Sequence, residues 1–345
     1  MQVAMYYNNN DVRLEELPTP SIGTGELLVK VQASGICGSD VMEWYRIKKA
    51  PLVLGHEVAG EVASVGEGVT GFKQGDRVCV SHHVPCNTCR YCLSGHHTAC
   101  QTLHTTNFFP GGFAQYIRVP AINVDRGTFL LPDNVSFEEA TFIEPLACVV
   151  RGQREANLKP GQHVLILGGG ISGLIHLLLA QAMGAERIIV TDISEYRLNM
   201  AKEFGADSVI SAKEDVPTRL RQVNGDRLAD VVIVCTSALS AFEQAFKSVD
   251  RGGTILCFAP TEPGATLAVP INDFWRNSVK VMPSYGNSPQ DAIVAIEWIR
   301  SGAVPVGKMI THKLSLAQAG LGFSLVAKGK DSLKVIIQPH KAETS

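Results

Sequence analysis

The sequence lacks the features that would direct it to a membrane, to nucleic acid or out of the cell. Its 345 residues carry 31 Lys+Arg against 33 Asp+Glu, a formal net charge of −2, with no long basic run. This balance gives no general attraction to nucleic acid or to an anionic membrane. The first residues, MQVAMYYNNNDVRLEE, do not show the basic and then apolar segments of a signal peptide. We therefore expect a soluble, cytoplasmic protein.

An uninterrupted apolar run of membrane-spanning character is missing as well. The one stretch that needs checking, residues 164–183, is mostly apolar but contains three consecutive glycines, His176 and Gln181. A buried strand, a turn and a buried helix explain this composition better than a membrane helix does.

Apolar sequence is plentiful, at 45% of residues against 19% charged, which is enough for sizeable cores. The length is too great for one ordinary core, so we expect two domains. Up to about residue 150, Gly and Asp separate short β-branched or alternating runs, as in a β-rich domain. From about residue 159, strand-like and helix-like segments alternate, which predicts an α/β domain with a doubly wound parallel sheet.

A glycine motif stands at the start of this second part. Gly168, Gly170 and Gly173 form a G-x-G-x-x-G pattern after a buried apolar run and before a helical segment. In that context the motif predicts a dinucleotide-binding loop. Gly168 permits the tight turn, Gly170 lets the pyrophosphate approach the backbone, and Gly173 lets helix and strand pack closely. The free N–H groups at the helix start, around Ile171 and Ser172, would hold the phosphates.

The next strand-like run ends at Asp192, where a carboxylate would accept hydrogen bonds from both ribose hydroxyls. It would also repel a 2′-phosphate, and Ile193 supplies no arginine for one, so we expect NAD rather than NADP. A glycine turn without a ligand is the alternative, which the agreement of loop, helix and carboxylate disfavours. Cys235 and Thr236 end a later strand, and we expect their backbone to face the nicotinamide ribose.

Four of the nine cysteines crowd into one segment. Without a secretion signal, crowded cysteines indicate metal ligation rather than disulfides. Four thiolates with no open position suit a structural zinc ion, and an iron–sulfur cluster is the alternative. The proposed ligands of this structural zinc are Cys86, Cys89, Cys92 and Cys100.

Taken together, these motifs resemble the zinc-dependent medium-chain alcohol dehydrogenase family. Residues 55–69 (GHEVAGEVASVGEGV) have the form of that family's zinc signature, and GICGSD at residues 35–40 precedes it. The cysteine segment and the glycine loop follow in the family's order. Residues 143–145 (IEP) and 191–198 (TDISEYRL) look most like the sorbitol (polyol) dehydrogenase branch.

The resemblance implies a GroES-like, β-rich catalytic domain, residues 1–152 and 288–345, and a Rossmann domain, residues 153–287. The active site would lie in the cleft between the two. Chains of this branch are commonly homodimers or homotetramers that extend one Rossmann sheet across a two-fold axis. Arg197, in the segment that matches the polyol branch, joins the expected cofactor contacts.

The resemblance also implies a catalytic zinc held by Cys37, His56 and Glu144. Three protein ligands and one open position are the usual pattern of a catalytic zinc. Glu57 would be a carboxylate behind these ligands or an exchangeable ligand that competes with water. Ser39 matches the hydroxyl that takes the substrate's proton.

The implied reaction transfers a hydride from a secondary alcohol to NAD and leaves a ketone. The substrate would be a polyol, a cyclitol or a sugar-derived hydroxy compound. An amino-alcohol oxidation like that of L-threonine 3-dehydrogenase is an alternative, because those enzymes share the same zinc motifs. A non-catalytic NAD-binding protein is the third possibility, against which the complete set of metal ligands argues.

Two positions depart from the family pattern. Met42 stands where a histidine often forms the outer end of the proton relay, so we expect the proton to leave through water or the cofactor ribose. Ser284 stands where polyol dehydrogenases tend to carry an arginine. His82 and His83 flank the cysteine segment, and residue type alone places them at the surface or behind the metal ligands. Asp40 is expected either near the zinc or in a turn.

Overall fold

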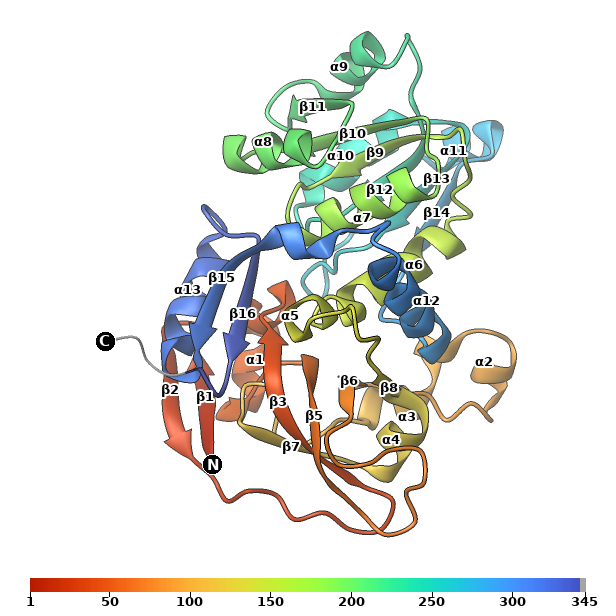
Figure 1. Ribbon diagram of the computed structural model, residues 1–345. Helices are drawn as coiled ribbons and strands as arrows, with labels where there is room; N and C mark the ends of the chain where they lie inside the picture. The colour runs from red at the N-terminus through yellow and green to blue at the C-terminus, as the bar shows by residue number, and fades with distance from the viewer. Residues whose placement is uncertain (342–345) are drawn as a thin grey trace. The chain divides into compact units, whose positions relative to one another are not determined.

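The computed structural model describes residues 1–341, and within it the chain divides into two compact units (Figure 1). Unit 1 consists of Met1–Ala147 together with the chain from Asn287 onward, and unit 2 is Cys148–Gly286. Helix α6 (Ile143–Glu155) runs from the first unit into the second. None of the helices in the described residues is long and apolar enough to cross a membrane.

Unit 2 is built on a six-stranded parallel sheet with the order β11-β10-β9-β12-β13-β14. Its strands are β9 (His163–Leu167), β10 (Arg187–Asp192), β11 (Ser208–Ser211), β12 (Ala229–Val234), β13 (Val249–Cys257) and β14 (Lys280–Pro283). Its helices are α7 (Ile171–Ala182), α8 (Glu195–Glu203), α9 (Val216–Val223), α10 (Leu239–Ser248) and α11 (Ile271–Asn277). The chain leaves β9 toward β10 and β11 and then returns to β12, so the sheet has a topological switch point between β9 and β12. This is the doubly wound α/β fold predicted from the sequence.

The turn from β9 into α7 depends on two glycines. Gly168 adopts φ = 106°, which favours glycine, and a Cβ on Gly173 would lie 1.9 Å from the carbonyl oxygen of Gly168. Every residue of β9 is buried, because helices cover both faces of a parallel sheet. The sequence therefore places the start of α7 at the carboxyl end of a central strand.

Unit 1 contains a seven-stranded sheet, β15-β16-β3-β5-β6-β8 with β7 paired to β3, and a three-stranded sheet, β2-β1-β4. The strands are β1 (Gln2–Asn8), β2 (Asp11–Glu16), β3 (Leu27–Gly35), β4 (Leu52–Val53), β5 (Glu57–Val65), β6 (Arg77–Ser81), β7 (Tyr116–Val119), β8 (Thr128–Leu130), β15 (Ile310–Ser315) and β16 (Lys334–Gln338). Only β15 and β16 pair in parallel among these described strands. Through β16, the end of the chain is hydrogen-bonded to β3, near its beginning.

Helices connect the strands of unit 1, and most of them are short. The α-helices are α1 (Glu43–Arg46), α2 (Arg90–Leu93), α3 (Gln101–Thr105), α4 (Ala121–Gly127), α5 (Phe137–Ala140), α12 (Pro289–Arg300) and α13 (Ala319–Lys328). The 3-10 helices are η1 (Gly38–Val41), η2 (Ile47–Lys49), η3 (His97–Ala99), η4 (Val306–Met309) and η5 (Leu316–Gln318). Helix α13 packs on β16 and β2, as Figure 1 also shows.

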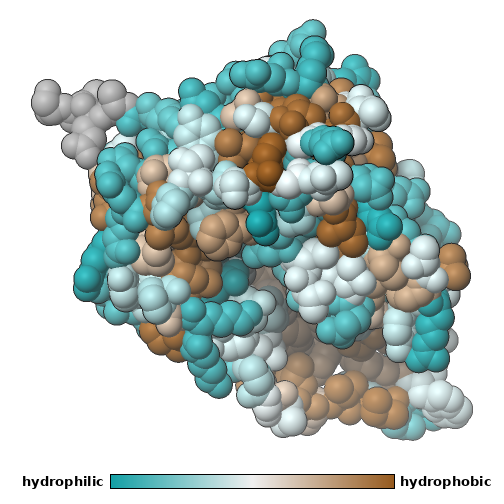
Figure 2. All heavy atoms as spheres, turned by 90° about the horizontal axis from the view of Figure 1, so that it is seen from below, coloured by the Kyte–Doolittle hydropathy of each residue, from teal (hydrophilic) through white to brown (hydrophobic). Residues whose placement is uncertain are grey.

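Each unit has its own apolar interior. In unit 2, side chains from β9, β12 and α10 form one cluster, represented by Leu165, Val232 and Phe242. In unit 1, one cluster lies between β3, β5 and β6, and a second involves β1, β16 and α13. On the face drawn in Figure 2, hydrophobic residues occur in separate patches among hydrophilic ones, as on ordinary folded surfaces.

Candidate metal and dinucleotide sites

The four clustered cysteines converge in the segment around α2 and η3. All four sulfurs lie within 4.8 Å of one another. The sulfurs of Cys89 and Cys92 are 3.5 Å apart, and those of Cys86 and Cys100 are 3.6 Å apart. Zinc–sulfur bonds of about 2.3 Å at tetrahedral angles place two sulfurs about 3.8 Å apart, so the arrangement fits a Zn²⁺ ion held by four thiolates.

Backbone N–H groups support these sulfurs. The N–H of Cys89 donates to Cys86 Sγ at 3.2 Å, and the N–H of Cys86 donates to Cys100 Sγ at 3.4 Å. Hydrogen bonds from Thr88 lower the pKa of Cys86, while burial raises the pKa of Cys92. The local contacts therefore favour the thiolate form of one cysteine and disfavour that of another. A bound metal ion would hold all four in the thiolate form.

A second potential metal-binding group brings together Cys37, His56 and Glu57, whose ligand atoms lie within 4.8 Å of one another. Cys37 follows β3, and His56 directly precedes β5. The antiparallel register of these strands pairs Gly35 with Glu57, which sets the two segments side by side. A thiolate, an imidazole and a carboxylate are a donor set that suits zinc.

Asp40 holds the imidazole of this group in place. The sequence Cys37-Gly-Ser-Asp40 forms a capping box at η1, in which the N–H of Cys37 donates to Asp40 Oδ2 at 3.0 Å. Oδ1 of the same carboxylate lies 3.3 Å from His56 Nδ1. Burial opposes a charge on His56, but Asp40 and Cys37 outweigh it and hold the pKa of His56 well above its usual value. The Asp40–His56 contact leaves the other ring nitrogen, Nε2, for a metal.

Glu57 contacts a buried cation as well as the ligand group. Its carboxylate pairs with the ammonium of Lys334 at the start of β16, and both side chains are 1% exposed. The Lys334 Nζ also lies 5.3 Å from the centre of the Phe142 ring. A Cβ on Gly35 would lie 2.1 Å from Glu57 Oε2, so the glycine leaves room for the pair.

Ser39 lies between the metal group and Arg46. The N–H of Ser39 is 3.4 Å from Cys37 Sγ. Its hydroxyl accepts a hydrogen bond from Arg46 Nη2 at 3.2 Å, and its carbonyl accepts one from Arg46 Nε at 3.0 Å. Glu144 is in the first turn of α6, where its Oε1 accepts from the amide of Asn287 at 3.4 Å. The group of Cys37, His56 and Glu57 does not include it.

The dinucleotide loop precedes α7, which begins at Ile171 and continues through Ser172. Asp192 ends β10, where its Oδ2 accepts from the N–H of Gly169 at 2.8 Å and its Oδ1 from the N–H of Ser194 at 2.9 Å. Arg197 Nη1 lies 3.7 Å from the same Oδ2. A Cβ on Gly170 would lie 3.7 Å from that Nη1. The loop, the carboxylate and the arginine are therefore adjacent.

The strand after the switch point reaches the same loop. Cys235 follows β12, and its backbone C and O would lie 3.2 Å from a Cβ on Gly168. Its N–H donates to the carbonyl of Leu167 at 2.8 Å. The hydroxyl of Thr236 accepts from the N–H of Ala238 at 3.4 Å. The backbone at these two residues thus lies next to the glycine turn.

Known proteins of similar sequence identify the family. Residues 23–132 match the alcohol dehydrogenase GroES-like domain, and residues 172–301 match the zinc-binding dehydrogenase domain. Sorbitol dehydrogenase from Bacillus subtilis is 34% identical over 353 residues, covering 99% of this chain and 98% of that protein. The chain belongs to the zinc-dependent alcohol dehydrogenase family.

Solved structures agree with this assignment. Galactitol-1-phosphate dehydrogenase from Escherichia coli is 27% identical with a TM-score of 0.85, over 98% of this chain and 100% of that one. A zinc-binding dehydrogenase from Sinorhizobium meliloti bound to NADP is 27% identical with a TM-score of 0.87, over 98% and 99%. The resemblance inferred from the motifs, with its GroES-like and Rossmann folds, is confirmed.

Residue type alone missed Lys334 and Arg46 of this zinc-dependent dehydrogenase, and it left His82 open between the surface and a place behind the metal ligands. The ring of His82 lies 4.8 Å from that of His56, and burial lowers its pKa well below the usual value. Lys334 interrupts an apolar run at the end of the sequence, and such an isolated lysine in a predicted buried strand is a signal that could have been used. Arg46 carries no comparable signal. Asp40, left open between a metal-site and a turn role, serves both.

Proposed function

We propose that this protein oxidises a secondary alcohol group of a polyol, cyclitol or sugar-derived hydroxy compound to a ketone, with NAD as the hydride acceptor. The observation that carries the proposal is the group of Cys37, His56 and Glu57 in a chain that also has the dinucleotide loop. Relatives named as sorbitol and galactitol-1-phosphate dehydrogenases favour a polyol-type substrate over an amino alcohol.

In this proposal Cys37, His56 and Glu144 hold the catalytic zinc. When bound, zinc supplies a Lewis acid that favours loss of the alcohol's proton, and the nicotinamide accepts the hydride. Asp40, 3.3 Å from His56 Nδ1, would orient that imidazole, and the Ser39 hydroxyl would take the proton. Cys86, Cys89, Cys92 and Cys100 would hold the second, structural zinc. Four sulfurs leave that ion no open position, so its role would be to fix the segment around α2.

The residues around the glycine loop support NAD as the cofactor. Within the described residues no side chain caps the start of α7, so its N–H groups would hold the pyrophosphate. The Asp192 carboxylate accepts a hydrogen bond from the N–H of Gly169 in the same loop. This carboxylate would accept from the ribose hydroxyls and repel a 2′-phosphate. Arg197 would complete the ribose site, and the backbone at Cys235 and Thr236 would face the nicotinamide ribose.

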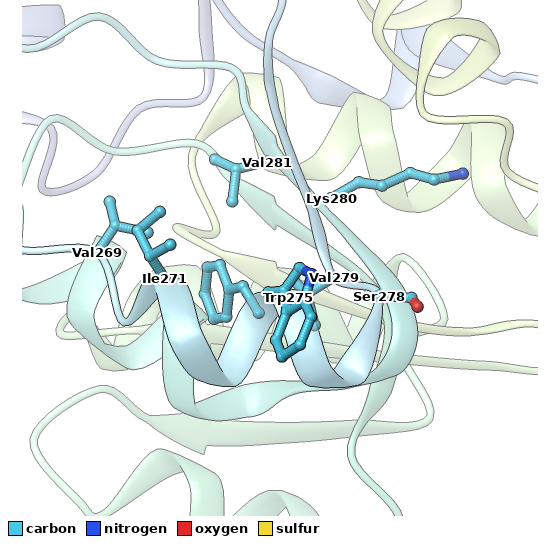
Figure 3. Close-up of a pocket in the computed structure, with 8 residues that line it drawn as sticks. Val269, Ile271, Trp275, Ser278, Val279, Lys280 and Val281 are labelled. Atoms are coloured by element: carbon cyan, nitrogen blue, oxygen red, sulfur yellow. The ribbon is translucent and has the colours of Figure 1, made fainter.

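A second copy of the chain is the partner that we propose, and we expect both to work in the cytoplasm. β14 is the last strand of its sheet within residues 1–341, so one of its edges is open. Beside it, α11 and β14 line a shallow pocket of about 650 Å³ (Figure 3). Trp275 is 77% and Ile271 69% exposed there. Pairing of two β14 strands would cover this apolar edge and give a homodimer, which could in turn form a homotetramer.

The test is an alcohol panel with NAD and with NADP on protein whose zinc content has been measured. The panel contains sugar alcohols, cyclitols, sugar acids and L-threonine. We expect NADH formation with a polyol-type substrate and two zinc ions per chain. Cys37→Ala should abolish turnover while the circular dichroism spectrum stays native. Unchanged turnover in this variant would reject the proposed catalytic zinc, and turnover of L-threonine alone would replace the polyol substrate.

A further inference from the structure

We infer that Arg46 is a positioning residue of the reaction, which fixes the Ser39 hydroxyl and the Asp40 carboxylate with one guanidinium. The inference rests on the proposed function, because it concerns the proton that the alcohol loses and the imidazole that holds the metal. Neither the family match nor the glycine and cysteine motifs assigns Arg46 a role.

The guanidinium is held at several points. Nε donates to the carbonyl of Ser39 at 3.0 Å, Nη2 donates to its hydroxyl at 3.2 Å, and Nη2 also lies 3.5 Å from Asp40 Oδ1. The Arg46 Cζ lies 4.5 Å from the centre of the Tyr45 ring, which supports one face of the group. Its side chain is 15% exposed, so the charge is largely removed from solvent. A planar group held in this way has a defined orientation.

The contact with Arg46 determines what the Ser39 hydroxyl can do. A hydroxyl has one hydrogen to donate and two lone pairs that accept. Arg46 occupies one lone pair, which leaves the other for the hydrogen of the substrate alcohol. The serine's own hydrogen must then go to a different acceptor, because a guanidinium has none and does not lose its proton in proteins. The positive charge beside Oγ also favours electron density on that oxygen as the proton moves.

This arrangement differs from a relay that ends in a base. The relay position is Met42, and Arg46 of α1 reaches the serine from the same segment. A permanent cation therefore lies beside Ser39, in place of a group that would accept the proton. The proton that enters Ser39 leaves to water or to the cofactor ribose, and Arg46 orients the hydroxyl without carrying the proton itself.

Arg46 also shares a carboxylate with a metal ligand. Asp40 Oδ1 is 3.5 Å from Arg46 and 3.3 Å from His56 Nδ1, and Asp40 is fully buried. The guanidinium and the imidazole therefore contact the same carboxylate, whose negative charge makes the imidazole a stronger electron-pair donor to a metal. Asp40 keeps its hydrogen bond from the Cys37 N–H when Arg46 is removed, so it should still orient His56, and the metal should be bound at least as tightly. A purely structural arginine would weaken activity and metal binding together.

The experiment compares Arg46→Met, Arg46→Lys and the matched control Lys49→Met. Lys49 is a cation of the same segment, 5.4 Å from the same Tyr45 ring, and contacts neither Ser39 nor Asp40. Each protein is assayed for kcat, KM and, by chelator competition, the dissociation constant of zinc. We expect kcat to fall about 10- to 100-fold in Arg46→Met with KM within about threefold of the parent. The Lys variant should lose less, and the control should match the parent.

Chemical rescue gives a further readout. Guanidinium chloride at millimolar concentration should restore part of kcat in Arg46→Met, and sodium chloride at the same concentration should not. A kcat within about twofold of the parent in Arg46→Met, or rescue by sodium chloride as well, would overturn the inference.

The zinc dissociation constant distinguishes a failure of the proposed function from a failure of the inference about Arg46. If the parent protein oxidises no alcohol in the panel, the proposed function fails, whatever the Arg46 variants do. In that case the dissociation constant still decides the inference. A value in Arg46→Met that is equal to or below that of the parent supports it, and a clearly higher value overturns it.

Discussion

The buried pair of Glu57 and Lys334 allows a quantitative prediction. Both side chains are 1% exposed, and the lysine also lies over the Phe142 ring. Lys334→Met keeps most of the apolar stem but removes the ammonium, which leaves a carboxylate buried without its cation. Removing one partner of such a pair costs about 3–5 kcal/mol in the free energy of unfolding. Since a domain is stabilised by only about 5–15 kcal/mol, the loss should be easily seen in urea denaturation.

The metal should change the size of this effect. The Glu57 carboxylate is within 4.8 Å of the ligand atoms of Cys37 and His56, so a bound zinc ion offers it an alternative cation. We therefore expect the full loss in protein treated with a chelator and a smaller loss in zinc-loaded protein. In cobalt-substituted protein, Lys334→Met should weaken the visible absorption, because an added carboxylate ligand raises the coordination number.

Two further variants test the reasoning. Lys334→Met combined with Glu57→Gln should recover part of the stability, because no unpaired charge then remains buried. Gly35→Ala should reproduce part of the loss, since its Cβ would lie 2.1 Å from Glu57 Oε2 and 2.7 Å from Lys334 Cε. A loss below about 1 kcal/mol in the chelator-treated Lys334→Met protein, at the level of an exposed ion pair, would refute the argument.

Three other predictions follow from the remaining sites. Cys89→Ala should lower the zinc content from two ions to one per chain and lower the melting temperature, and an unchanged zinc content would show that the four cysteines hold no metal. Asp192→Ala should shift the ratio of kcat/KM for NAD over NADP toward NADP by about tenfold, because the charge that repels a 2′-phosphate is lost. An unaltered ratio would place the ribose elsewhere. Trp275→Glu should give a smaller species in light scattering with an intact fold, and the same mass as the parent would exclude the α11–β14 edge as the interface.

The local sites could be predicted because short-range geometry decides them. Cys86, Cys89, Cys92 and Cys100 are close in sequence, so a few turns of backbone suffice to bring their sulfurs together. In the same way, the strand, the glycine turn and the helix around Gly168 are consecutive. Asp192 could be placed because neighbouring parallel strands end at the same edge of a sheet.

The group of Cys37, His56 and Glu57 needed more than spacing. The sequence placed these residues in one site only through the resemblance to a family. In the structure, the physical reason is the antiparallel register of β3 and β5, which pairs Gly35 with Glu57. A register of this kind depends on which strands pair with each other, and the residue types around Cys37 and His56 do not specify that pairing.

The sequence by itself indicated a β-rich first part, a doubly wound second part, the four-cysteine segment and the dinucleotide loop, because each depends on periodicity or on residues close along the chain. The family and the GroES-like fold came from the resemblance that these motifs carry together. Only the tertiary structure decided the partners of the charged groups at the metal site. Lys334 reaches Glu57 because β16 pairs with β3, and these strands come from opposite ends of the chain. Arg46 joins Ser39 to Asp40 because α1 folds back over η1. A charged side chain is stable inside a protein only beside a counter-charge, and the packing of the strands and helices decides which counter-charge that is.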